Sequence, residues 1–496
     1  MQKPKQALGM PPGMAPPGAQ FDYRWRWPAM IVLLSANFMN LLDVGIVNVA
    51  LPSIQKNLGA DEQQLEWIVA IYILLFALGL LPLGRLGDML GRKRMFGTGV
   101  AGFILMSAFC AIAGNIHVLI IARALQGLAA AMLAPQVMAI AQTMFAPKER
   151  AAAFSLFGLV AGLASFAGPL VSGLLIHINA FGVGWRAIFL INVPIGLVTL
   201  LAAAIWVPKV PAHAGIRNDW VGIALAALAL LCLVFPLIEG RAYGWPLWCF
   251  AAIALGIPLL VAFVAWQRRQ AHLARPALLP IYLMGHRDYI LGALSVSVFY
   301  SALQGFFLVF VIFLQQGLAY SALETGIATT PFPVGVAIAS MLARHVESLR
   351  AKIVSGACLM IASYLALWVI ITRSEGSLDP WTLTLPLLIG GLGCGITIAS
   401  LFQTVMRTVP MKDAGAGSGA LQVIQQVGGM LGIALVSEIF FSGLHQHLQG
   451  PAGVALAFKQ AFGATVVYYI AANAFVALST LGLQFKLTQF APQSSP

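Results

Sequence analysis

Charged side chains are scarce in this sequence of 496 residues: 28 Lys and Arg with 16 Asp and Glu make up only 9% of it. A soluble globular domain carries about 25% charged residues, so the composition excludes an ordinary water-soluble enzyme. Hydrophobic residues reach 60%, and the mean hydropathy is +0.89. Such a composition also excludes a disordered or fibrous chain.

Signatures of disulfides, metals and nucleotides are also missing. The five cysteines form no CxxC pair, which excludes a disulfide framework and a zinc motif. The eight histidines are scattered, so we expect no catalytic residues and no metal site, and hence no enzyme. No glycine-rich run ends in Gly-Lys-Ser/Thr, the ending of an ATP-binding P-loop. We therefore expect no bound cofactor, and an ion gradient as the energy source for any uphill work.

Fourteen apolar runs are long enough to cross a membrane, which takes about 20 helical residues each. The runs are continuously apolar rather than alternating, which favours helices over a β-barrel. The sequence thus predicts an all-α integral membrane protein with 14 transmembrane helices. The expected spans are residues 28–52, 65–85, 95–114, 118–144, 151–178, 187–207, 219–239, 246–266, 289–316, 322–343, 352–372, 380–406, 416–441 and 458–484.

The basic residues predict which side of the membrane each loop faces. Of the 28 Lys and Arg, five lie in loops on one side, Arg123 lies inside the fourth span, and the other 22 lie on the side of the N-terminus. Because basic loops stay in the cytoplasm, we expect both termini there. The net charge of +12 then reflects a basic rim that faces anionic lipid, so no nucleic-acid partner is expected. The Pro/Gly-rich tail lacks the features of a cleaved signal peptide.

Two inner loops indicate an internal repeat. Gly84–Lys93 follows the second span and Ala343–Lys352 follows the tenth, with Arg, Leu and Lys at matching positions. These spans are eight apart, so two helices are inserted between two six-helix pseudo-repeats, an arrangement typical of secondary transporters. Ordinary short basic loops are the alternative interpretation. The expected segments are a tail (1–27), an N-terminal half (28–207), a linker with two extra helices and a basic loop (208–288), a C-terminal half (289–485) and a tail (486–496).

The first span carries a polar stripe of Asn37, Asn40, Asp43 and Asn48 within an arc of about 140°. A carboxylate near mid-membrane is costly and is a functional candidate by default. Asp43 would either bind a proton and a cationic substrate in turn, or be a structural acid held permanently by its neighbours. Arg123 lies at a similar depth and is its candidate partner, although the sequence does not show that the two helices adjoin.

The inner loop 84–94 and the fifth span have mechanical explanations. Gly84 and Gly91 allow a tight turn and Asp88 can pair with Arg92, so the loop can latch against the other half; a plain positive-inside anchor is the alternative. In the fifth span, small residues and a proline indicate that another helix approaches closely at the interface where the two halves move against each other. Static packing predicts the same pattern. Those residues are Gly162, Gly168, Pro169 and Gly173.

Several further side chains are candidates for a cavity that takes a bulky apolar ligand, with ordinary packing as the alternative for each. They are Asn37, Asn40, Trp67, Tyr72, Gln126, Phe299, Tyr300, Gln304 and Glu438. For Glu438, close to the outer end of its span, a rim residue is the favoured interpretation.

Together these motifs resemble the major facilitator superfamily, in its fourteen-span drug:proton antiporter branch. The resemblance covers nearly the whole chain after the tail. The chain departs from the branch at Gly45, Leu174 and Gln425. The matching segments are Leu42–Pro52, Gly84–Arg94, Arg123 with Gln126-Gly127, Gly162–Gly173, Trp185–Pro194 and Gly417–Gly432.

The resemblance implies a proton-coupled exporter of lipophilic or amphipathic compounds in a bacterial inner membrane, working by alternating access. It implies coupling by Asp43, proton transfer by Arg123, and latching by Asp88 with Arg92. Some relatives work with periplasmic adaptor proteins, and nothing in the sequence specifies one. A metabolite or nutrient transporter on the same scaffold, with an anionic substrate paired to Arg123, is the alternative; a membrane-embedded enzyme is a distant third.

Overall fold

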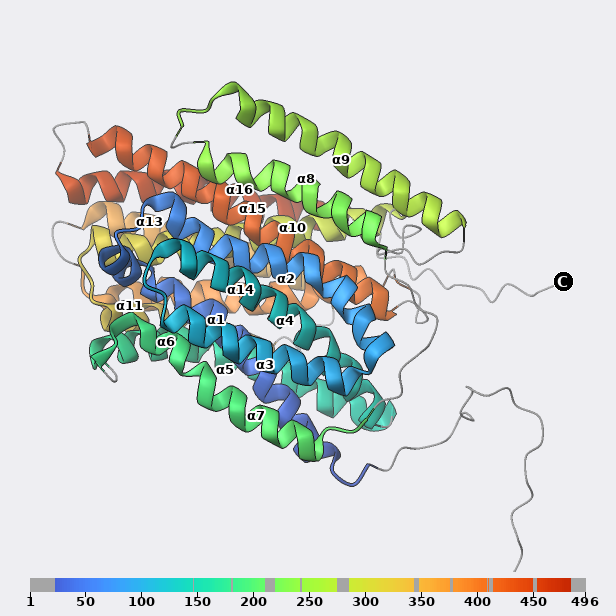
Figure 1. Ribbon diagram of the computed structural model, residues 1–496. Coiled ribbons are helices and arrows are strands. Elements are labelled where there is room, and N and C mark those ends of the chain that lie inside the picture. The colour runs from blue at the N-terminus through green and yellow to red at the C-terminus, as the bar shows by residue number, and fades with distance from the viewer. Residues whose placement is uncertain are drawn as a thin grey trace, which may run out of the picture.

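The computed structural model describes residues 23–145, 147–179, 182–209, 219–240, 243–273, 285–342, 348–374, 378–407, 409, 414–448 and 453–482. Most of the predicted tail 1–27, all of the tail 486–496, and residues 343–347 of the second loop segment lie outside these ranges. The described residues form helices and no strand, which confirms the predicted all-α fold class (Figure 1).

Long helices and tight turns build the N-terminal half. Its helices are α1 (Arg26–Leu58), α2 (Glu62–Leu90), α3 (Arg92–Ala111), α4 (Ile116–Met144), α5 (Pro147–His177), α6 (Ala187–Leu190) and α7 (Asn192–Trp206). Gly59 ends α1 with a φ of +65°, and Asp61 begins α2 through a capping box with Gln64. Gly91, with a φ of +100°, joins α2 directly to α3. These turns return the chain at once, so consecutive helices run antiparallel.

The rest of the chain adds a helix pair and the C-terminal half. The elements are α8 (Trp220–Glu239), α9 (Leu247–His272), α10 (Arg287–Ile312), the π-helical turn η4 (Phe313–Gly317), α11 (Ala322–Thr329), α12 (Pro331–Leu342), α13 (Leu349–Arg373), α14 (Thr384–Met406), α15 (Ala414–Leu448) and α16 (Val454–Gly482). One predicted span is divided into α11 and α12 at Pro331, because proline has no backbone N–H to continue the helical hydrogen bonds.

The predicted spans agree with the helices. Thirteen helical segments of the described residues are long and apolar enough to cross a membrane. The remaining predicted span, residues 151–178, corresponds to α5, within which Ala167–His177 is a shorter apolar helix. Several helices run past the apolar runs; α15, for example, ends at Leu448 rather than at 441. Backbone hydrogen bonding continues into these polar ends, which hydropathy alone does not mark.

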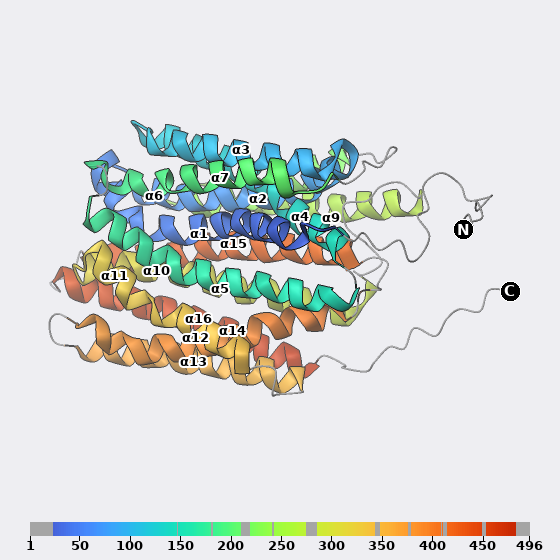
Figure 2. The ribbon, with the colours of Figure 1, turned by 90° about the horizontal axis from the view of Figure 1, so that it is seen from below.

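Helices α2 and α5 of the N-terminal half pack against the C-terminal half. α2 packs against α15, and α5 packs against α11 and α12; Figure 2 shows α11 beside α5. The inserted pair α8 and α9 lies on the outside of the bundle in Figure 1, where α8 contacts both α2 and α15. Trp67 of α2 donates its indole N–H to Glu239 of α8 at 2.7 Å. The inserted pair thus covers the seam between α2 and α15.

The described hydrogen bonds between the halves gather toward one end of the bundle, where α1 finishes; we call this the far end. Gln315 donates to the carbonyl of Val49 at 2.8 Å, and Gln316 donates to the Gln55 side chain at 2.7 Å. These bonds hold the two halves together at the far end.

Candidate functional site

Asp43 and Arg123 meet inside the N-terminal half. The guanidinium Nη1 of Arg123 in α4 lies 2.5 Å from Oδ2 of Asp43 in α1. The side chains are 1% and 0% exposed, so this is a fully buried ion pair. The helix adjacency that the sequence left open is therefore present, because α1 packs against α4.

Two amide side chains complete the shell of donors around the carboxylate. Gln126, one turn after Arg123, donates from Nε2 to Oδ1 of Asp43 at 2.9 Å, and Asn192 at the start of α7 donates to the same oxygen at 2.9 Å. Gln126 also accepts a hydrogen bond from Arg123 at 2.8 Å. Asp43 is thus held by three donors from two neighbouring helices, Arg123 and Gln126 of α4 and Asn192 of α7.

Aromatic rings enclose the cation from the other side. The Arg123 guanidinium carbon lies 4.2 Å from the ring centroid of Tyr72 and 5.9 Å from that of Phe189, both within cation–π range. The Tyr72 hydroxyl donates to Oδ1 of Asn40 at 2.5 Å. Three of the predicted cavity residues, Asn40, Tyr72 and Gln126, therefore belong to this buried network.

A glycine brings the two helices that carry this network close together. A Cβ at Gly127 would clash with the backbone carbonyl of Tyr72, so α2 and α4 approach to backbone contact at this level. The guanidinium of Arg123 consequently reaches the carbonyl of Ile68 in α2 at 3.3 Å. A larger residue at 127 would separate Arg123 from α2.

This arrangement can hold one exchangeable charge. While Asp43 is ionised, it and Arg123 cancel; a proton on Asp43 leaves the site with one net positive charge in surroundings of low dielectric. The three donors would then face a neutral carboxyl group. A change of one proton is therefore strongly coupled to how α1, α4 and α7 pack at this point.

The predicted latch residues lie at the opposite end of the N-terminal half. Arg92 donates to Asp88 at 2.8 Å and to the carbonyl of Ala139 in α4 at 3.1 Å. A Cβ at Gly84 would lie 3.4 Å from Pro135, also in α4. These contacts of Gly84, Asp88 and Arg92 are made within the N-terminal half, and Gly91 supplies the positive φ of the turn.

Of the predicted residues of α5, Pro169 and Gly173 lie at the seam between the halves, whereas Gly168 lies against α1 of its own half. A Cβ at Gly168 would be 3.3 Å from the backbone of Gly45 in α1. One at Gly173 would be 2.5 Å from the carbonyl oxygen of Ala322 in α11. Pro169 lies against the same helix, because its carbonyl is 2.6 Å from where a Cβ of Gly326 would be. The burial of Gly162 lies outside what the structure describes.

The other predicted cavity residues are spread over several interfaces. Phe299, 1% exposed, packs edge-on to Tyr300 at 5.7 Å, and Gln304 lies against Gly429 where α10 meets α15. Trp67 is bonded to the inserted helix α8, and Glu438 accepts a hydrogen bond from Ser442 at 2.6 Å. Asn37 is half-buried on α1. None of the described contacts joins these residues to Asp43.

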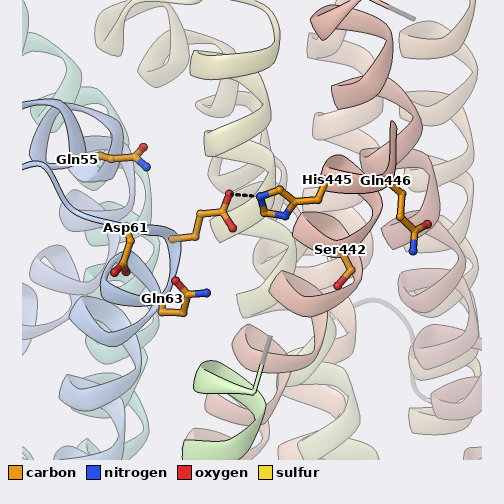
Figure 3. A pocket seen from close by; sticks show the side chains of 7 residues that line it. Gln55, Asp61, Gln63, Ser442, His445 and Gln446 are labelled. Carbon is orange, nitrogen blue, oxygen red and sulfur yellow. Dashed lines mark ion pairs between the residues drawn. The ribbon is translucent and has the colours of Figure 1, made fainter. Parts of the chain in front are cut away.

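A pocket of about 580 Å³ opens at the far end between the halves (Figure 3). Its walls come from α1, the turn after it, α2 and α15, and the pair of His445 with Glu62 crosses it at 3.7 Å. None of these side chains was predicted. The lining residues are Gln55, Asp61, Glu62, Gln63, Ser442, His445 and Gln446.

Two buried polar residues of the site, Asn192 and Ser107, went unpredicted, and so did the buried Glu66 elsewhere on α2. Asn192 and Ser107 are both 0% exposed and are bonded to each other at 3.1 Å, and Glu66 of α2 is 2% exposed. A polar residue inside an apolar run was the signal that found Asp43, and it applies equally to Asn192 and Glu66. Ser107 gave no such signal, since serine is common in membrane helices.

A bundle of apolar helices with a buried ion pair in one of two packed halves is the architecture of a membrane transporter. The chain matches the model of the Major Facilitator Superfamily over residues 33–433, and it belongs to that superfamily. This assignment confirms the predicted family and the prediction that the chain is a transporter rather than an enzyme.

Curated relatives are similar over most of the chain. The probable actinorhodin transporter of Streptomyces coelicolor is 36% identical over 88% of this chain and 77% of its own length. The tetracenomycin C resistance and export protein of Streptomyces glaucescens is 30% identical over 84% and 76%. Among solved structures, the POT family transporter PepTSo has a TM-score of 0.67 at 15% identity, over 92% of this chain and 98% of its own. That likeness shows the fold alone.

Proposed function

We propose that this protein exports lipophilic or amphipathic compounds in exchange for protons, with Asp43 as the coupling carboxylate. The observation that carries the proposal is the fully buried pair of Asp43 and Arg123 inside a membrane-spanning bundle. Ionisable groups at membrane depth are costly and are retained for function. The substrate class and the direction rest on relatives named for actinorhodin transport and for tetracenomycin C resistance and export.

In the proposed cycle, Asp43 gives its proton to the cytoplasm, and its charge is then balanced by Arg123. The ionised site favours binding of a cationic or amphipathic compound from the same side. After the halves rearrange, a proton from outside binds Asp43 and the compound leaves. One proton thus enters for each compound exported, and the proton gradient supplies the energy.

We place the far end on the outer face of the membrane, with both termini in the cytoplasm. This orientation rests on the excess of basic residues in the loops at the end where the termini lie. The hydrogen bonds from Gln315 and Gln316 then join the two halves on the outer side. In the conformation that opens outward, Asp88 and Arg92 would latch the inner side.

The experiment is substrate-induced proton release in inside-out vesicles with an imposed pH gradient. Wild type and Asp43→Asn are compared across lipophilic cations, neutral compounds and anions. We expect cations to collapse the gradient in wild type and not in Asp43→Asn. A matched control is Asp379→Asn, which changes an acid that caps the short helix before α14 and keeps a capping side chain.

Two outcomes contradict the proposal. Full proton release by Asp43→Asn would remove this residue from the coupling step. Proton movement with anions alone would replace drug export by exchange of an anionic metabolite.

A further inference from the structure

Asn192 connects the coupling carboxylate to two other helices. Its side-chain amide, at the start of α7, donates one hydrogen bond to Oδ1 of Asp43 in α1 at 2.9 Å and one to Oγ of Ser107 in α3 at 3.1 Å. Both N–H groups of the amide are therefore used. All three side chains are 0% exposed.

The neighbours fix the direction of this amide. Ser107 donates its own hydroxyl to the carbonyl of Phe189 at 2.9 Å, so its oxygen accepts from Asn192. An ionised carboxylate only accepts, so Asp43 also requires the N–H side. The carbonyl Oδ1 of Asn192 is left buried without a donor among the described residues. This orientation suits the ionised form of Asp43 and leaves one acceptor unused.

We propose that Asn192 is a positioning residue that responds to the protonation of Asp43; the inference rests on the proposed function. A proton that binds Oδ1 of Asp43 meets an N–H that already points at that oxygen. The amide then turns by half a revolution about its terminal torsion, which is broad and roughly two-fold. Its Oδ1 accepts the new O–H, and its hydrogen bond to Ser107 is given up. No covalent bond of Asn192 changes.

This turn carries the protonation state of α1 to the contact between α3 and α7. While Asp43 is ionised, Asn192 ties α7 to both α1 and α3; once Asp43 is protonated, the tie to α3 is released. The unused carbonyl oxygen becomes the acceptor that a buried carboxyl group requires. The loss of this buried hydrogen bond allows α3 and α7 to shift relative to each other within the N-terminal half.

The other titratable and charged groups around Asp43 belong to other elements. Arg123 in α4 holds Oδ2, and Tyr72 in α2 lies against Arg123 with its hydroxyl on Asn40. Cys110 in α3 donates to Gln126 at 3.6 Å. The described hydrogen bond from α5 in this region comes from the neutral hydroxyl of Ser172, which donates to the carbonyl of Ile46. These groups set the charge of the site, whereas Asn192 is neutral and can change direction.

The test measures proton release as a function of pH in wild type, Asn192→Leu and Ser107→Ala. Asn192→Leu is close in size and removes a donor to the carboxylate, so the ionised form is less stable and the half-maximal pH should rise by about one to two units. Ser107→Ala keeps that donor but frees the amide to turn, so we expect a rise of less than one unit. A purely structural role would lower the amplitude at every pH and leave the half-maximal pH unchanged.

Infrared difference spectra give a second readout, which depends only on a folded wild type. In protein labelled with ¹³C-asparagine, the band of the protonated carboxyl group should appear together with a shift of an amide carbonyl band. No amide shift on protonation would overturn the proposal, as would an unchanged half-maximal pH in both variants. If wild type itself releases no protons with any compound, the proposed function has failed instead, and the two failures are thereby distinguished.

Discussion

Gly173 of α5 faces the carbonyl oxygen of Ala322 in α11 so closely that a Cβ at residue 173 would lie 2.5 Å from that oxygen. The two residues belong to different halves and lie toward the far end. The absence of a side chain at 173 is therefore a condition for closing this end of the transporter.

Gly173→Ala should shift the protein away from the conformation in which the halves meet at the far end, and export should fall about 5- to 150-fold, because about 1–3 kcal/mol of overpacking opposes each closure. The measurement is the distance between spin labels on two exposed residues, Lys56 near the end of α1 and Ser321 just before α11. Gly114→Ala is the control, since nothing lies within 4 Å of a Cβ there. Equal distance distributions in both variants would contradict the prediction.

Replacing one partner of the buried ion pair should cost more stability than replacing both partners. Arg123→Gln leaves an uncompensated carboxylate at 0% exposure, and we expect a loss of about 3–5 kcal/mol in the free energy of unfolding. The double variant Asp43→Asn with Arg123→Gln should recover most of this loss and still fail to release protons. Thermal unfolding in detergent measures the first effect and vesicle assays the second. A double variant no more stable than Arg123→Gln would count against charge burial as the cause.

The bond from Trp67 to Glu239 should anchor the inserted helix pair. Trp67→Phe keeps most of the ring and removes the donor, so a loss of about 1–2 kcal/mol is expected, at the lower end for a bond to a charged group because the site is half-buried. A double-mutant cycle with Glu239→Ala isolates the bond. Trp381→Phe, at a side chain that is 70% exposed, should have little effect. Additive losses in the cycle would show that the bond contributes nothing.

Gly91→Ala should destabilise the turn between α2 and α3. A φ of +100° is unfavourable for any residue with a Cβ, and we expect a loss of about 1–3 kcal/mol. Gly285→Ala is the matched control, because its backbone needs no positive φ and nothing lies near its Cβ position. The measurement is the midpoint of thermal unfolding for both variants. Similar midpoints would mean that the turn relaxes without strain.

Hydropathy was enough to place the helices, because a bilayer requires about 20 apolar residues for each span and the backbone must bond within the helix. The same rule singled out Asp43 and Arg123 as residues out of place in lipid. It did not find Asn192, although an amide inside an apolar run is the same kind of signal. The pocket near His445 was beyond reach of the sequence, since its walls come from helices far apart in the chain.

The sequence by itself determined the number of spans, the family and the two charged residues of the site, since these follow from local composition and short motifs. Only the tertiary structure decided that Arg123 touches Asp43 and that Asn192 links it to Ser107. It also placed Trp67 against the inserted helix rather than beside Asp43. These outcomes depend on which helix faces which neighbour. That choice is made by small residues such as Gly127, which let particular backbones approach, and apolar periodicity does not encode it.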